Sequence, residues 1–224
     1  MIRCVMFDLG NVLVHFDTQR WYDFIATHQR NYSIKAGDCF NSDHGKKFDL
    51  GLISYLEYYE AVRRAYYLNI GIDAFFFEFT DIMTPDQRMI RLKRFLKQNG
   101  VKLALVSNIN NYHFDYVAQR WPEVFADFDY LALSFQQKSI KPDDKMWRVS
   151  AAPLDAKEEE CFFIDDRELN IAAFKRWGGG IGHHYNVVDD AFCPNGRLDI
   201  ERRELVFRLA SLGLISFSQA ADII

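Results

Sequence analysis

Short runs of consecutive apolar residues alternate along the chain with segments in which apolar residues recur at helical spacing. An apolar run of about four to eight residues between turn signals is typical of a buried strand, whereas apolar residues three and four apart indicate an amphipathic helix. Strands that alternate with helices predict a parallel sheet with right-handed crossovers. The predicted strands span residues 2–7, 101–106, 130–133, 161–164 and 181–184.

Helical spacing between these strands predicts the remaining elements. Thr84 is expected to cap a helix whose first residue is Pro85, and Asn99 with Gly100 is expected to end it. The polar, irregular segment 30–47 is predicted to be a loop or linker. The other predicted helices span residues 18–27, 53–67, 72–82, 112–120, 143–151, 169–177 and 200–212.

The order of these elements predicts an α/β fold with a three-layer, Rossmann-like core around the parallel sheet. The helical block between the first two strands of the sheet indicates an insertion, which we refer to as the helical cap because of the resemblance described below. The predicted division is a core of residues 1–16 and 85–189, a cap of residues 17–84 and a C-terminal helical extension of residues 190–224. A chain of 224 residues suits one domain with such an insertion.

Composition narrows the function classes. The formal net charge of −4 argues against a general nucleic-acid binder, which usually has a basic excess. No run of about 18 apolar residues occurs, so no membrane span is expected. Cysteines without close pairing make a zinc site or a disulfide framework improbable, and we expect a reducing cytoplasm. The cysteines are Cys4, Cys39, Cys161 and Cys193.

Polar residues stand where the predicted strands end. In a parallel α/β sheet, ligands collect at the carboxyl ends of the strands. We therefore expect the side chains at these ends to converge on one edge of the sheet. They are Asp8 after the first strand, Ser107 and Asn108 after the second, Lys141 in the turn after the third, and Asp165 and Asp166 after the fourth.

Three neighbouring carboxylates repel one another unless a cation joins them. Magnesium prefers oxygen ligands and commonly takes one or two carboxylates together with a substrate phosphate. Asp8 could then attack phosphorus, since carboxylate nucleophiles that form aspartyl-phosphates are well established. Lys141 would balance the negative charge, and Ser107 would donate a hydrogen bond to a phosphoryl oxygen.

This ordered set of residues resembles the haloacid dehalogenase superfamily over roughly residues 3–185. The motif sequences are most similar to one branch of subfamily IA, which contains α-D-glucose-1-phosphatase-like proteins and epoxide hydrolase N-terminal phosphatase domains. The cap inserted after the first strand also agrees with that superfamily. The motifs are Val5-Met6-Phe7-Asp8-Leu9-Gly10-Asn11, Leu105-Val106-Ser107-Asn108, Lys141-Pro142-Asp143 with Ser134 before it, and Phe163-Ile164-Asp165-Asp166.

The resemblance implies a role for each residue. Asp8 would be the nucleophile. The expected magnesium ligands are Asp8, the Gly10 carbonyl, Asp166 and Asp165, the last directly or through water. Phosphate would be bound by Ser107, Asn108 and Lys141.

Gly10 departs from the family pattern. Most phosphatases of the superfamily carry a second aspartate two residues after the nucleophile, as general acid and then base. General acid–base help is worth about 10² to 10⁴ in rate, so its loss favours substrates with a good leaving group, such as an anomeric or enolic phosphate. Residues that could supply a substitute acid are His15, Asp17, His44 and Asp49.

The sequence thus predicts a magnesium-dependent phosphatase that hydrolyses a small phosphorylated metabolite, with sugar phosphates among the candidates, through an aspartyl-phosphate at Asp8. Two alternatives stay open. One is a catalytically weak binding or regulatory protein, because Gly10 replaces the usual acid. The other is a metal-independent 2-haloacid dehalogenase-like hydrolase. The sequence leaves the oligomeric state and the physiological substrate open.

Overall fold

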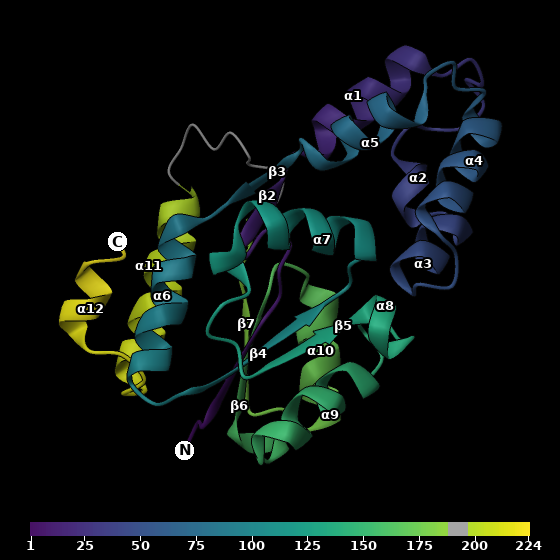
Figure 1. Ribbon diagram of the computed structural model, residues 1–224. Coiled ribbons are helices and arrows are strands. Elements are labelled where there is room, and N and C mark those ends of the chain that lie inside the picture. The colour runs from purple at the N-terminus through teal and green to yellow at the C-terminus, as the bar shows by residue number, and fades with distance from the viewer. Residues whose placement is uncertain (188–196) are drawn as a thin grey trace.

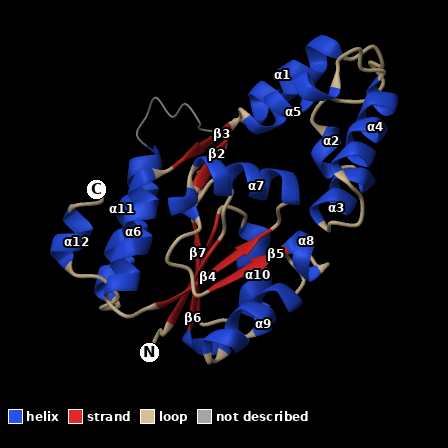
Figure 2. Cartoon of the chain, in the orientation of Figure 1, coloured by secondary structure: helices blue, strands red, loops and turns tan. Residues whose placement is uncertain are grey.

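The computed structural model describes residues 1–187 and 197–224 of the chain, without the side chain of Arg197. Within this part, five parallel strands form one sheet in the order β5-β4-β1-β6-β7 (Figures 1 and 2). The predicted strands and the parallel α/β fold are therefore confirmed. The strands are β1 (Cys4–Phe7), β4 (Lys102–Ser107), β5 (Tyr130–Leu133), β6 (Cys161–Asp165) and β7 (Ile181–His184).

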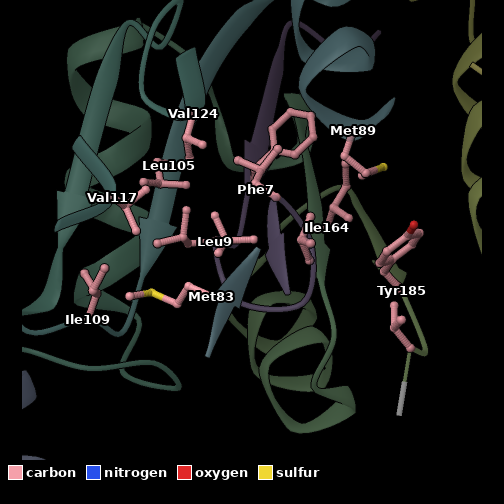
Figure 3. Close-up of a cluster of buried hydrophobic side chains, with 14 of the residues drawn as sticks. Phe7, Leu9, Met83, Met89, Leu105, Ile109, Val117, Val124, Ile164 and Tyr185 are labelled. Atoms are coloured by element: carbon pink, nitrogen blue, oxygen red, sulfur yellow. The ribbon is translucent and has the colours of Figure 1, made fainter. Parts of the chain in front are cut away.

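The sheet is buried on both faces, because alternate residues of each strand point to opposite sides. On one face, Phe7 packs in the cluster that also holds Met89 of α6 (Gln87–Gln98) and Val117 of α7 (Asn111–Arg120) (Figure 3). The helix α11 (Arg197–Ser211) covers the same face through Leu205, Val206 and Leu209. On the other face, Cys4 and Met6 pack with residues of α9 (Lys145–Ala151) and α10 (Glu168–Trp177).

Five helices lie between β2 (Val14–Phe16) and β3 (Met83–Pro85) in the chain, and these two strands form an antiparallel ribbon that joins the helices to the core. Figure 1 shows these helices grouped apart from the sheet, beyond the ribbon. Aromatic rings fill their interior, where Trp21 meets Phe75 and Phe79 edge to face. We call this group the cap: α1 (Thr18–His28), α2 (Asp38–Asn41), α3 (Asp43–Asp49), α4 (Tyr55–Tyr66) and α5 (Ile72–Thr80).

The prediction of a loop over residues 30–47 was wrong in its second half, where α2 and most of α3 lie. Their sequences are polar and short, so no helical spacing of apolar residues predicted them. The Ser42 hydroxyl accepts a hydrogen bond from the Gly45 amide at 3.0 Å and caps α3. A Cβ atom at Gly45 would lie 2.3 Å from the Phe40 carbonyl oxygen, so the close approach of α2 and α3 requires glycine.

The predicted start of the next helix was also wrong. Thr84 and Pro85 belong to β3, where Thr84 pairs with His15. The helix α6 begins at Gln87, and the Asp86 carboxylate caps it by accepting hydrogen bonds from the amides of Arg88 and Met89. An aspartate is as good a cap as a threonine, and pairing with β2 decided between them.

Several short elements lacked a sequence signal. They are α8 (Ser134–Gln137), α12 (Phe217–Ala221), and the 3₁₀ turns η1 (Pro122–Val124), η2 (Ala152–Leu154) and η3 (Glu158–Glu160). The division of the chain into core, cap and extension stays a prediction, and its boundary at residues 189 and 190, like Cys193, lies outside the described residues. In the described part, every helix is too short or too polar to cross a lipid bilayer.

Candidate active site

The carboxylates predicted at the strand ends come together. Asp8 directly follows β1, and its amide donates to the Ile164 carbonyl at 2.9 Å, which sets Asp8 beside the end of β6. Asp165 is the last residue of β6, and Asp166 follows it. One oxygen from each of Asp8, Asp165 and Asp166 lies within 4.8 Å of the other two. The parallel sheet therefore brings three acids to one point.

Lys141 lies between two of these acids. Its Nζ atom is 2.8 Å from Asp8 Oδ1 and 2.7 Å from Asp165 Oδ2, and only 1% of its side chain is exposed. Burial alone would lower the pKa of Lys141, but the two carboxylates raise it above the ordinary value, so the lysine stays charged. Burial raises the pKa of Asp8 to about 8, and repulsion by Asp165 and Asp166 adds to the shift while Lys141 opposes it.

Asp165 and Asp166 have different surroundings although they are adjacent. Both Asp165 oxygens accept hydrogen bonds from Asn170, and they also accept from the Arg167 amide and from Lys141. Asp166 instead lines the central cavity, where Asn11 donates to its Oδ2 at 3.0 Å. Asp165 is thus committed to protein partners, whereas Asp166 has oxygen lone pairs available to a ligand.

Ser107 is the last residue of β4 and Asn108 follows it, and both line the same cavity. The Asn108 side chain accepts from the Lys141 amide at 2.7 Å and donates to the Lys141 carbonyl at 3.0 Å. These two hydrogen bonds fix the backbone that presents Lys141. The side chain of Asn108 therefore positions the lysine, which the sequence did not indicate.

Gly10 lies on the floor of the cavity. Among the described residues, no group donates a hydrogen bond to its carbonyl oxygen, although its neighbours Leu9 and Asn11 are both hydrogen-bonded to Val14. A Cβ atom at Gly10 would lie 3.7 Å from the nearest atom of the Phe16 ring, an ordinary contact. The site is therefore open to a larger side chain at this position.

The cavity has a volume of about 430 Å³ and lies between the strand ends and the cap. Its core side is polar and is lined by Asp8, Asp166, Lys141 and Ser107. Its cap side is more aromatic. The lining residues of the cap and of the ribbon are Phe16, Thr18, Tyr22, Phe40, Asn41 and Asp49.

The residues proposed as substitute acids differ in whether they line the cavity. His15 contacts Asp86 at 3.2 Å, and Asp17 caps α1 by accepting from the Arg20 amide. Neither of them lines the cavity, and His44 does not either. Asp49, at the end of α3, does line it.

Asp49 is held by the core rather than by the cap alone. Its carboxylate accepts from the Asn110 side chain at 3.2 Å, and its carbonyl accepts from the Ser134 hydroxyl at 2.6 Å. Asn110 also caps α7 and lies 3.4 Å from Nδ1 of His113. The sequence missed Asn110 and Asn11. Their one signal was a position at a strand end, which many loop asparagines share.

Most of the chain matches the sequence model of one family. Residues 2–178 match the sequence model of the haloacid dehalogenase-like hydrolases. The fold, the inserted helices and the acid cluster on the strand ends are in keeping with this match. The chain belongs to the haloacid dehalogenase-like hydrolase family.

Individual relatives add detail. The chain is 28% identical over 178 residues to the sesquiterpene phosphatase astK of Aspergillus oryzae, covering 79% of this chain and 86% of that protein. A crystal structure of the HAD family enzyme bt-2542 from Bacteroides thetaiotaomicron, in complex with magnesium and inorganic phosphate, is similar in fold, with a TM-score of 0.71 and 21% identity over 86% of this chain and 98% of that one. The L-2-haloacid dehalogenase of Xanthobacter autotrophicus, with chloropropionic acid covalently bound, is more distant, with a TM-score of 0.55 and 16% identity over 81% of this chain and 76% of that one.

Proposed function

We propose that the protein is a magnesium-dependent phosphatase that hydrolyses a small phosphomonoester through an aspartyl-phosphate at Asp8. The observation that carries this proposal is the cluster of Asp8, Asp165 and Asp166 around the charged amine of Lys141. Three carboxylates with one lysine leave a net negative site that is suited to a divalent cation. The names of the relatives agree, since one is a phosphatase and another was crystallised with magnesium and phosphate.

The donor set fits magnesium. The ion prefers carboxylate and carbonyl oxygens and usually keeps several waters or phosphate oxygens. Asp8, Asp166 and the Gly10 carbonyl would bind it directly, because these groups face the cavity. Asp165, whose oxygens are already bonded, would act through Lys141 and Asn170 or through a water. When bound, magnesium supplies positive charge at the phosphoryl oxygens.

The residues of the chain have distinct tasks in the reaction. Asp8 attacks phosphorus with one carboxylate oxygen as the bond to the leaving oxygen breaks. Lys141 stabilises negative charge on the phosphoryl group, and the Ser107 hydroxyl donates to one of its oxygens. The side chain of Asn108 is already hydrogen-bonded to the Lys141 backbone. Its backbone amide would therefore be the group that donates a hydrogen bond to a phosphoryl oxygen. Water then attacks the aspartyl-phosphate and regenerates Asp8.

The cavity sets the size and character of the substrate. A volume of about 430 Å³ holds a phosphate with a small organic group. The rings of Phe16, Tyr22 and Phe40 offer flat apolar contact, and Thr18 and Asn41 offer polar contact beside them. Such a mixed wall suits one face of a sugar phosphate as well as a compact apolar alcohol phosphate. Sugar phosphates and isoprenoid phosphates therefore belong in the first substrate panel.

The test is a panel of phosphate esters and 2-haloacids, assayed with magnesium, with a chelator and with Asp8→Asn. We expect turnover of phosphate esters alone, abolished by the chelator and by the substitution. Activity on 2-haloacids that survives the chelator would establish the dehalogenase instead. Ligand binding without any turnover would establish a binding protein, the alternative that Gly10 favours. Full phosphatase activity in Asp8→Asn would refute the mechanism.

A further inference from the structure

The proposed phosphatase has a nucleophile but lacks an acid at position 10, and the cavity holds one further carboxylate on its cap side. Asp49 is the last residue of α3 and lines the cavity that Asp8 also lines. Its Oδ1 accepts from Asn110, which leaves Oδ2 without a partner among the described residues. A carboxyl group with one anchored and one unbonded oxygen is well placed to exchange a proton with a bound ligand.

A short loop connects Asn110, the hydrogen-bond partner of Asp49, to Ser107, where we propose that the phosphoryl group binds. Ser107 ends β4, and Asn110, the partner of Asp49, follows three residues later. Three residues span at most about 11 Å between Cα atoms, and the loop between them lines the cavity throughout. Asp49 therefore borders the loop that begins at Ser107, and the proposed proton transfer requires a bound ester to turn its leaving oxygen, which is bonded to phosphorus, toward Asp49.

The backbone around Asp49 is fixed to the core. The Ser134 hydroxyl donates to the Asp49 carbonyl at 2.6 Å. The Ser134 hydroxyl oxygen also accepts a hydrogen bond from the Ile109 amide at 2.9 Å. Lys138 donates to the carbonyl of Gly51, two residues beyond Asp49, at 2.6 Å. The end of α3 is thus a part of the cap that is anchored to the core next to the loop after β4. A catalytic group there would be held at a set distance from the phosphate.

The surroundings of Asp49 bring its pKa into the range in which a carboxyl group can both give and take a proton near neutral pH. Burial raises the pKa of Asp49 to about 6, and the hydrogen bond from Asn110 opposes that shift. His113 on α7 is kept neutral, because burial lowers its pKa to about 4. Other ionisable groups nearby are Tyr58 on α4, Lys138 after α8, Lys46 on α3 and, across the cavity, Asp8, Asp166, Lys141 and Arg167.

We propose that Asp49 is the general acid and base of this enzyme, in place of the absent aspartate at position 10. In the first step, the P–O bond of the ester breaks as Asp8 bonds to phosphorus, and the leaving oxygen takes the proton of the Asp49 carboxyl. In the second step, Asp49 takes a proton from the attacking water, the bond between phosphorus and Asp8 breaks, and inorganic phosphate leaves. Asp49 is then protonated again, and Asp8 is again a carboxylate. This assignment rests on the proposed function.

The first experiment compares Asp49→Asn with the unchanged protein on two substrate classes. Alkyl phosphates need a proton on the leaving oxygen, whereas 4-nitrophenyl phosphate releases a stable phenolate. We expect kcat/KM to fall about 10² to 10³-fold for alkyl phosphates and less than about threefold for 4-nitrophenyl phosphate. Asparagine keeps the oxygen that accepts from Asn110, so the fold is preserved. Asp17→Asn, an aspartate outside the cavity, is the matched control and should change neither value.

The second experiment is the pH profile of kcat/KM for an alkyl phosphate. The profile is measured at saturating magnesium, which would keep Asp8 ionised. The acid form of Asp49 exists below its pKa, so the unchanged protein should then lose activity about tenfold per pH unit above a pH near 6. Asp49→Asn should lack this limb. Thermal unfolding gives a check without turnover. A raised pKa in the folded state makes the fold less stable as pH rises from about 4 to 6, and Asp49→Asn should remove that loss.

A third variant restores the family pattern. Gly10→Asp has room, since its Cβ would meet only the Phe16 ring at 3.7 Å. In the Asp49→Asn background it should recover at least about tenfold of the lost activity on alkyl phosphates. Equal loss on both substrate classes in Asp49→Asn would mean that Asp49 only positions the cap, and no loss on either would exclude it as the acid. If the unchanged protein turns over no phosphate ester, or Asp8→Asn stays active, the proposed function itself fails.

Discussion

The two ends of the cavity are built in different ways. At the phosphate end, Asp8, Lys141 and Asp165 lie on the ends of neighbouring strands or in a turn beside them, and the sheet fixes their positions. At the other end, where we propose that the leaving group lies, Asp49 reaches the cavity through contacts between the cap and the core. The first arrangement depends on the fold common to the family, and the second depends on particular side chains of this chain. We therefore expect changes at the phosphate end to affect all substrates alike, and changes at the other end to separate them.

The largest effect should follow from Asp8→Asn. Loss of the nucleophile should lower kcat by at least about 10⁴-fold on every phosphate ester in the panel. The protein should stay folded, because Lys141 keeps its ion pair with Asp165. The measurement is single-turnover kinetics, together with a search for phosphorylated protein by mass spectrometry. A loss confined to one substrate class would contradict the uniform effect expected at this end.

Asp166→Asn should come next. It removes a charged oxygen ligand from the proposed magnesium site, and we expect about a 10² to 10³-fold loss of kcat/KM at low magnesium, equal for alkyl and aryl esters. Magnesium should raise the Tm of the unchanged protein and should raise that of the variant much less. Asp144→Asn, an exposed acid away from the cavity, is the control. An unchanged magnesium response in Asp166→Asn would remove Asp166 from the metal site.

Asn108→Ala tests the support of the lysine. It removes both side-chain hydrogen bonds to the Lys141 backbone and should cost about 10 to 100-fold in kcat on all substrates. The KM should change less, because Lys141 and Ser107 remain. Asn99→Ala, which breaks hydrogen bonds at the far end of α6, should not alter turnover. A change in KM alone would assign Asn108 to substrate binding.

The smallest effect should come from the aromatic wall. Phe40→Leu reduces flat apolar contact and should raise KM by about three- to tenfold for substrates with a bulky organic group, while a minimal alkyl phosphate is unaffected. Phe77→Leu, on an exposed face of the cap, is the matched control. Equal changes for large and small substrates would show that Phe40 supports the cap rather than the substrate.

The difference between the two ends also explains what the sequence predicted. The ends of strands can be predicted from the sequence, because a buried apolar run that stops at a polar residue marks the edge of a parallel sheet. Asp8, Lys141, Asp165 and Asp166 were found in this way, and the structure brings them together. The roles assigned to them are predictions that the experiments above test.

The contact between Asp49 and Asn110 could not be predicted from the sequence in this way. It joins residues 61 positions apart, and no local pattern marks either of them. From the sequence, Asp49 was one of four equal candidates, together with His15, Asp17 and His44. The helices α2 and α3 were missed for a related reason, because a buried glycine at Gly45 and a serine cap set their packing. Features that depend on tertiary contact need the structure.

The ribbon of β2 and β3 has a consequence for how such proteins diversify. The chain leaves the core at Phe16 and returns at Met83, and these two residues are paired with each other. Everything between them is therefore one insert that the chain enters and leaves at the same place, and hydrogen bonds such as that from Ser134 to Asp49 hold it against the core. A different insert could be grafted at the same pair without altering the order of the sheet or the acids at its edge. New specificities can then arise by exchange of whole inserts, provided that the new insert also supplies a group in place of Asp49.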